Sequence, residues 1–303
     1  MSIKICVITP ISHLEVFGAL GEMDMSLSHL VLENPNGPYA TYYKQQREKG
    51  RFVILDNSAF ELEQQGRGLD PDPVLDAAEI TNPTEVIATD CLFDGVATLE
   101  STERFIARMK ERKVLGKYKV MAVAQGKTEQ EWWACFSRLL YLPDVDTIGL
   151  SKLAVPQSFL GERESPGCVA RSRLICTRQI AQGFSVPRSI YPLIGLNGQQ
   201  VESIGYNLAY GKVLHLLGGD NWTPWEMQQQ KRYPWIRSND SSAAVWYGKY
   251  CKVFSEEGKI EDIITEKPDL ENKDWYTEQR LATPEVQTLI LKNIIYWHMA
   301  CKS

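Results

Sequence analysis

The sequence predicts an α/β fold built on a parallel sheet, and two observations support this prediction. Short apolar runs rich in Val, Ile and Leu recur along the chain, and most of them are followed by a stretch with helical periodicity. The runs are nearly continuous rather than alternating, which is typical of parallel strands covered on both faces. Regular alternation of strands and helices implies right-handed crossovers between neighbouring parallel strands.

The apolar runs predict nine strands, at residues 3–9, 29–33, 52–56, 86–90, 118–124, 147–151, 191–196, 213–217 and 235–239. Helices are expected at residues 39–49, 72–80, 98–113, 128–141, 168–183, 198–210 and 224–231. Thr128 and Glu131 have the spacing of a capping box at the start of one helix. Nine strands are one more than an eight-stranded barrel needs, so one of them would be an insertion. A doubly wound open sheet stays possible on periodicity alone.

The C-terminal part of the chain differs in composition. Residues 255–278 contain nine acidic residues and three lysines, which is typical of a solvated surface connection. A final helix is expected over 283–301, where apolar positions such as Leu289 and Ile294 would pack back on the body. We therefore expect a main domain over 1–250, followed over 251–303 by an acidic connection and a packed helix.

The charge and composition exclude several classes of protein. The formal net charge is −5, which argues against a protein that coats nucleic acid by bulk charge. Without the acidic connection the rest of the chain is near neutral, so a focused nucleic-acid site stays possible. No run reaches the roughly 20 apolar residues that a membrane helix needs, and residues 1–10 lack the pattern of a signal peptide. The seven scattered cysteines fit a reduced compartment, and we expect a cytoplasmic protein without membrane contact.

Polar residues stand at the ends of several predicted strands. Asp56 and Asp90 each close a strand, while Gln125 and Asp240 directly follow one. In a parallel barrel these ends converge on one face, where polar side chains serve chemistry better than packing. Paired carboxylates suit displacement at a sugar anomeric carbon, and a buried glutamine suits recognition of a heterocycle edge. A single aspartate at a strand end is also a common helix cap or turn former, so the pattern by itself only suggests glycosyl transfer with a base-like group.

Six short motifs follow one another in a recognisable order. They are Asp56-Asn57-Ser58-Ala59-Phe60-Glu61, Thr89-Asp90-Cys91, Ala124-Gln125-Gly126, Ile148-Gly149-Leu150, Leu216-Leu217-Gly218 and Arg237-Ser238-Asn239-Asp240-Ser241-Ser242. In content and order they resemble the tRNA-guanine transglycosylase superfamily, and most closely its phage branch of DpdA-type DNA-guanine transglycosylases. The resemblance covers roughly residues 50–245. It implies a (β/α)8 TIM barrel with a C-terminal helical extension, in which segment 191–196 is left unmatched as the insertion.

The resemblance also implies the function and the site. The protein would be a pentosyltransferase that flips a deoxyguanosine out of DNA and replaces guanine with a 7-deazaguanine, such as 7-cyano-7-deazaguanine. Asp240 would attack C1′ and form a covalent intermediate, with Asp56 as the general acid/base. The residues implied in base binding are Asp90, Gln125, Gly149, Leu150, Leu217, Gly218, Asn57 and Phe60.

Three departures from the family pattern matter. Asn57-Ser58-Ala59 makes the loop beneath the base bulkier than the Ser-Gly-Gly of the family, and Glu61 changes the charge where the family has glutamine. The zinc-binding Cys-x-Cys-x-x-Cys motif is absent, so we expect no zinc subdomain, no metal and no cofactor. Because the tRNA-modifying enzymes usually carry that zinc subdomain, its loss favours the branch that acts on DNA.

The expected partners are DNA, the free 7-deazaguanine base and the guanine product, in the host cytoplasm if the protein is phage-encoded. Basic residues that follow or end strands are candidates for phosphate contacts, namely Lys127, Lys152, Arg163, Arg171, Arg173 and Arg237. Three alternatives stay open: the same reaction on tRNA, an unrelated barrel glycosidase that uses Asp56 and Asp240, and a catalytically silent nucleic-acid-binding subunit.

Overall fold

Eight parallel strands form one sheet that nearly closes into a barrel, in a computed structural model that describes residues 2–59, 70–182, 212–260 and 281–302. The strand order is β1-β8-β7-β6-β5-β4-β3-β2. The two end strands meet at a bridge between Cys6 and Met23, where the Met23 N–H donates to the Ile5 carbonyl at 3.2 Å. The strands are β1 (Lys4–Val7), β2 (Asp24–Leu27), β3 (Val53–Asp56), β4 (Glu85–Ile87), β5 (Lys119–Val123), β6 (Thr147–Ser151), β7 (Val213–Leu217) and β8 (Ile236–Ser241). The predicted (β/α)8 barrel is thus confirmed, and the open doubly wound sheet is excluded.

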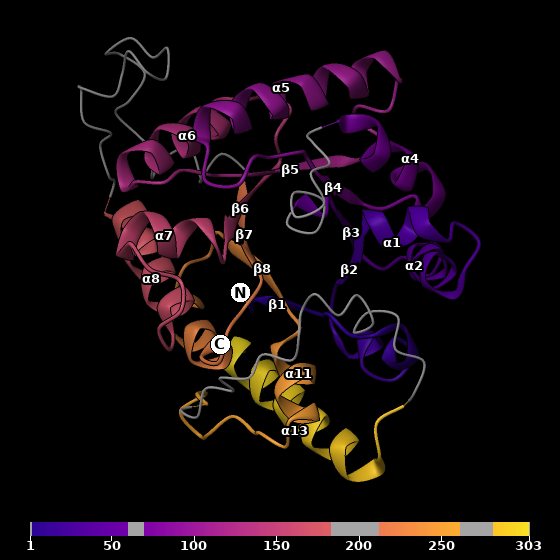
Figure 1. Ribbon diagram of the computed structural model, residues 1–303, viewed down its shortest axis with the longest axis vertical. Coiled ribbons are helices and arrows are strands. Elements are labelled where there is room, and N and C mark those ends of the chain that lie inside the picture. Colours follow the sequence, from indigo (N-terminus) through magenta and orange to yellow (C-terminus); the bar gives the residue numbers. More distant parts are fainter. Residues whose placement is uncertain (1, 60–69, 183–211, 261–280, 303) are drawn as a thin grey trace.

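Helices surround the strands on all sides, with α5 and α6 along one side in Figure 1 and α11 and α13 along the opposite side. Their bounds are α1 (Ser28–Glu33), α2 (Pro38–Glu48), α4 (Pro71–Thr81), α5 (Gly95–Glu111), α6 (Glu129–Tyr141), α7 (Ala154–Leu160), α8 (Cys168–Ala181), α10 (Thr223–Gln230), α11 (Ala243–Lys249) and α13 (Pro284–Cys301). Two short 3-10 helices are η1 (Ile11–His13) and η2 (Gly18–Leu20). No helix within the described ranges is long and apolar enough to cross a membrane.

Local capping explains where several helices begin. The Asp94 side chain accepts from the Ala97 N–H at 2.9 Å and starts α5, and Thr128 accepts from the Glu131 N–H at 3.2 Å and starts α6. The Glu131 carboxylate turns back to the Lys127 N–H at 2.9 Å, one residue earlier than the predicted capping box requires.

The last helix packs on the barrel, as expected. Helix α13 contacts α10 and α11, and its Ile290, Ile294 and Trp297 belong to the main hydrophobic core. The Cys301 carbonyl also accepts a hydrogen bond of 3.2 Å from the Ile3 N–H beside β1. Of the acidic connection, only residues 255–260 fall within the described part of the chain.

One predicted strand is wrong. Residues 29–33 lie in α1, where Leu30 and Val31 face the core, and the second strand is formed instead by Asp24–Leu27 just before it. This strand was missed because aspartate is rare in strands, yet Asp24 is neutralised here by Arg51 at the amino-terminal end. The expected strand 191–196 and helix 198–210 lie outside the described residues.

The core has two layers, one inside the barrel and one between strands and helices. The inner layer consists of Cys6, Ile8, Met23, Met25, Ile54, Ile87, Met121 and Val123. The outer layer is larger and includes Trp132, Phe136 and Trp297. This inner layer is apolar, whereas polar side chains lie at the carboxyl ends of the strands. That end is where (β/α)8 barrels build their sites.

Candidate functional site

Asp240 is a largely buried carboxylate at the carboxyl end of the barrel. It lies on β8 with 7% of its surface exposed. Its Oδ1 accepts a hydrogen bond from His215 Nε2 at 3.0 Å and another from the Gly218 N–H at 2.8 Å. Its Oδ2 receives no hydrogen bond from any residue that the structure describes. One carboxylate oxygen is therefore fixed by two donors, while the other has no such partner among the described residues.

Gly218 owes its place beside Asp240 to its conformation. Its φ is +69°, in the left-handed region that favours glycine, and a Cβ here would come within 2.4 Å of Lys152 Cδ. The turn points the Gly218 N–H at Asp240, so the glycine at the end of β7 builds part of the site.

Asp56 is the second carboxylate, at the carboxyl end of β3. It is half-buried, and its Oδ1 accepts from the Ser58 N–H at 2.6 Å. Ser58 has a φ of +56° and turns the chain away from the strand. Around the barrel, β1 and β2 separate β3 from β8, so Asp56 and Asp240 belong to the same face without being neighbours.

The structure brings three predicted base-binding residues together. Asn57 Nδ2 donates to Asp90 Oδ1 at 2.7 Å, and Gln125 Nε2 donates to Asp90 Oδ2 at 2.5 Å. Gln125 Oε1 accepts from the Phe93 N–H at 3.1 Å, and all three side chains of the network are buried. The two amides fix the Asp90 carboxylate at the ends of β3, β4 and β5, as a site that selects hydrogen-bond donors requires.

Gly149 on β6 and Leu217 on β7 lie close together inside the barrel. Leu217 packs against the inner core, and a Cβ on Gly149 would come within 2.5 Å of Leu217 Cδ1. Leu150 is different, because its side chain lies in the outer core and can serve the site only through its backbone. Phe60 lies outside the described residues.

Four of the six predicted phosphate-binding residues are exposed: Lys127, Lys152, Arg163 and Arg171. Lys127 follows β5 and Lys152 follows β6, at the same end of the barrel as the carboxylates. The Arg163 guanidinium lies 4.9 Å from the ring centroid of Phe93, beside the Asp90 network. Arg171 pairs with Glu162 at 3.2 Å.

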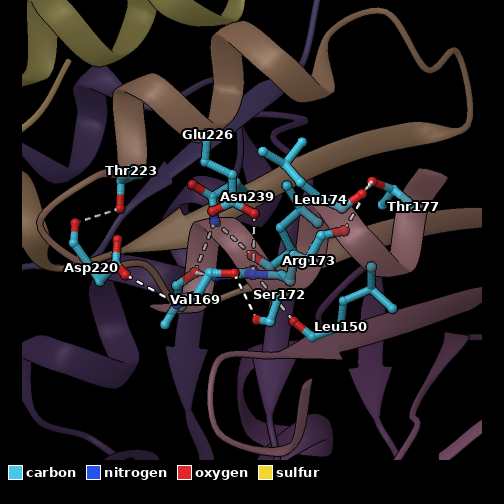
Figure 2. Close-up of polar contacts among 12 residues, drawn as sticks. Leu150, Val169, Ser172, Arg173, Leu174, Thr177, Asp220, Thr223, Glu226 and Asn239 are labelled. Atoms are coloured by element: carbon cyan, nitrogen blue, oxygen red, sulfur yellow. Dashed lines mark hydrogen bonds and ion pairs between the residues drawn. The ribbon is translucent and has the colours of Figure 1, made fainter. Parts of the chain in front are cut away.

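The other two basic residues are structural, which corrects the prediction. Arg173 is fully buried on α8, where its Nη2 donates to the Gly218 carbonyl at 2.7 Å and its Nε lies 3.2 Å from the Glu226 carboxylate (Figure 2). Arg237 lies in the barrel lumen and pairs with the fully buried Glu85 at 2.7 Å. Arg173 is thus enclosed in the protein, and Arg237, with 16% of its side chain exposed, is engaged by Glu85 rather than by a phosphate.

Sequence reasoning also missed His215 and Ser238. The signal was available, because alternation along β7 puts His215 on the same face as Leu217, and alternation along β8 puts Ser238 on the same face as Asp240. Within the described ranges, no group of three or more His, Cys, Asp or Glu residues is arranged to hold a metal ion.

Comparisons with known proteins add no further evidence on the family. No protein-family model matches the chain, and a search of curated proteins found no match.

Proposed function

We propose that the protein is a DNA-guanine transglycosylase, a pentosyltransferase that replaces guanine in DNA with a 7-deazaguanine such as 7-cyano-7-deazaguanine. The observation that carries the proposal is the state of Asp240, whose Oδ1 is held by two donors while Oδ2 accepts no hydrogen bond from the described residues. A carboxylate held in this way is oriented for attack on a carbon atom. A second carboxylate, Asp56, stands on the same face to move protons.

In the first half of the reaction, Asp240 Oδ2 attacks C1′ of a deoxyguanosine flipped into the barrel mouth. The bond between C1′ and guanine N9 breaks as the ester bond to Asp240 forms. The electron pair leaves with guanine, and a proton from the Asp56 carboxyl neutralises the departing base. Guanine then leaves, and the deoxyribose stays covalently attached to the enzyme.

The second half reverses these steps with a different base. The Asp56 carboxylate takes the N9 proton of the incoming 7-deazaguanine, whose nitrogen attacks C1′ and releases Asp240. Protons and electrons balance over the cycle, so the exchange needs neither a nucleotide cofactor nor a redox partner.

The Asp90 network gives this reaction its preference for guanine-like bases. Guanine and 7-deazaguanines both carry N–H donors at N1 and at the exocyclic amine. The Asp90 carboxylate is acceptor-only when ionised, and Asn57 and Gln125 hold it in place. An adenine edge offers an acceptor at N1 and would leave that carboxylate facing a lone pair.

DNA would approach from the face that carries Lys127, Lys152 and Arg163. These cations are exposed at the carboxyl end of the barrel, while the formal net charge of −5 for the whole chain limits binding elsewhere. The choice of DNA over tRNA rests on the sequence resemblance and on the missing zinc motif.

The test is mass spectrometry of nucleosides from duplex DNA and from tRNA, each incubated with the protein and 7-cyano-7-deazaguanine. We expect the deazaguanine deoxynucleoside in the DNA sample and none in the tRNA sample. Modified tRNA alone would move the assignment to tRNA, and modification of neither would contradict base exchange altogether and favour a silent binding subunit or a glycosidase.

A further inference from the structure

A row of polar side chains, all buried except the partly exposed Arg237, runs through the barrel lumen and ends at Asp240. Glu85 on β4 accepts two hydrogen bonds from Arg237, of 3.0 and 2.7 Å. Arg237 Nε donates to Ser238 Oγ at 3.0 Å, and Ser238 Oγ lies 2.7 Å from His215 Nδ1. His215 Nε2 lies 3.0 Å from Asp240 Oδ1. The row thus connects a buried ion pair to the carboxylate that we propose as the nucleophile.

An irregularity in the sheet makes this row possible. The register between β7 and β8 shifts so that Leu214 pairs with Ile236, whereas His215 pairs with Ser238. Arg237 is the extra residue of this β-bulge. Because a bulge interrupts the alternation of side chains, Arg237 and its neighbour Ser238 both take part in the lumen network.

The hydrogen-bond partners determine which nitrogen of His215 carries the proton. An ionised Asp240 carboxylate can only accept, so the hydrogen bond to its Oδ1 needs the proton on His215 Nε2. The guanidinium of Arg237 can only donate, so Ser238 Oγ accepts from it and keeps its own proton to donate to His215 Nδ1. Nδ1 is then the acceptor and Nε2 carries the hydrogen, which points at Asp240 Oδ1. Burial lowers the pKa of His215, which keeps the ring neutral near neutral pH.

We infer that His215 is a positioning residue for Asp240, in which a neutral imidazole of fixed tautomer holds Oδ1 and leaves Oδ2 to attack. The catalytic consequence rests on the proposed function, whereas the hydrogen-bond assignment does not. A neutral donor orients the carboxylate without pairing its charge. A cationic donor would form an ion pair and make Asp240 a weaker nucleophile.

The charges around His215 fit this role. Asp240 and Arg237 face it from β8 and Glu85 faces it from β4. Of the two carboxylates near His215, Glu85 is already paired with Arg237. Asp240 is therefore the one that His215 holds. Ser238 favours the neutral ring through its hydrogen bond to Nδ1, and its removal should raise the pKa of His215.

The first test uses nitrogen NMR of the full chain labelled in its histidines. The chain has only four histidines, so the variant His215→Gln assigns the His215 signals by their loss. We expect a neutral ring with the proton on Nε2, a shift of those signals in Asp240→Asn, and a higher titration midpoint in Ser238→Ala. A proton on Nδ1 at neutral pH, or signals that ignore the Asp240→Asn change, would overturn the assignment.

The second test compares His215→Gln with His215→Leu in single-turnover formation of the covalent enzyme–DNA adduct. The glutamine amide can still donate towards Asp240, whereas leucine cannot. We expect His215→Leu to slow adduct formation by about 10- to 100-fold, the size of one lost hydrogen bond to a charged group, with KM for DNA little changed. His215→Gln should recover most of the rate, and thermal unfolding of both variants checks their folding.

The two tests separate the inference from the proposed function. Equal adduct rates in wild type and His215→Leu would overturn the positioning role while leaving base exchange intact. A wild-type protein that forms no adduct with DNA or tRNA would overturn the proposed function, and the NMR result would then decide the hydrogen-bond assignment alone.

Discussion

Replacement of Glu226 by glutamine tests whether burial or the neighbouring Arg173 has the larger effect on the pKa of the Glu226 carboxyl. Glu226 on α10 has no exposed surface and lies 3.2 Å from Arg173 Nε (Figure 2). Burial raises the pKa of the Glu226 carboxyl to about 7 from 4.5, and Arg173 lowers it by less. Arg173 in turn donates to the carbonyl of Gly218, whose N–H holds Asp240.

The raised pKa predicts the sign and size of a pH effect on stability. Below about pH 4.5 the carboxyl is protonated in both the folded and the unfolded chain, so its contribution to the free energy of unfolding is fully present. Between pH 4.5 and 7 the unfolded chain loses the proton while the folded protein keeps it, which favours unfolding. With 1.36 kcal/mol per pKa unit, the rise from 4.5 to about 7 corresponds to about 3 kcal/mol of stability lost by pH 8.

The assay is urea denaturation followed by tryptophan fluorescence at several pH values from 4 to 8. The difference in free energy of unfolding between wild type and Glu226→Gln should move by about 3 kcal/mol against the wild type as pH rises. Glu257→Gln is the control, because its carboxylate is 76% exposed, and it should follow the wild type. A wild type that gains stability over Glu226→Gln with rising pH would show that Arg173 outweighs burial and would refute the reasoning.

Two further predictions concern the barrel mouth. Gly149→Ala places a methyl group 2.5 Å from Leu217 Cδ1, so the free energy of unfolding should fall by about 1–3 kcal/mol in urea denaturation; unchanged stability would contradict the close packing. Lys152→Ala should lower the slope of log affinity against log salt for duplex DNA by about 0.9, measured by fluorescence anisotropy. Lys110→Ala, at the far end of α5 and paired with Asp144, should leave that slope unchanged, and equal effects of both variants would argue against a focused DNA face.

Much of the fold could be predicted from the sequence because the parallel strands are buried on both faces. Segment 213–217 is apolar except for His215, segment 147–151 is buried along its whole length, and their bounds agree with β7 and β6. The second strand was not predicted because Asp24 pairs with a residue far along the chain, Arg51. Such a tertiary partner changes the local preference and is invisible in a short sequence window.

The site was predictable in part, for a related reason. Strand ends converge in a barrel, so Asp90 and Gln125 could be grouped from their positions alone, whereas Asn57 came from the resemblance. Arg173 was misassigned although it occupies the buried stripe of α8 shared by Val169 and Ile180, a periodicity that could have revealed it. The bulge that directs Arg237 into the lumen depends on strand pairing, which no single segment of sequence encodes.

The covalent intermediate provides the most direct test of the account. Wild-type protein incubated with a guanine-containing DNA duplex and then denatured should yield a protein–DNA adduct on a gel, and peptide mapping should place the deoxyribose on Asp240. Asp240→Asn should form no adduct and exchange no base, while Asp94→Asn, which alters only the cap of α5, should behave as the wild type. Full exchange activity in Asp240→Asn, or an adduct on another residue, would contradict the central claim.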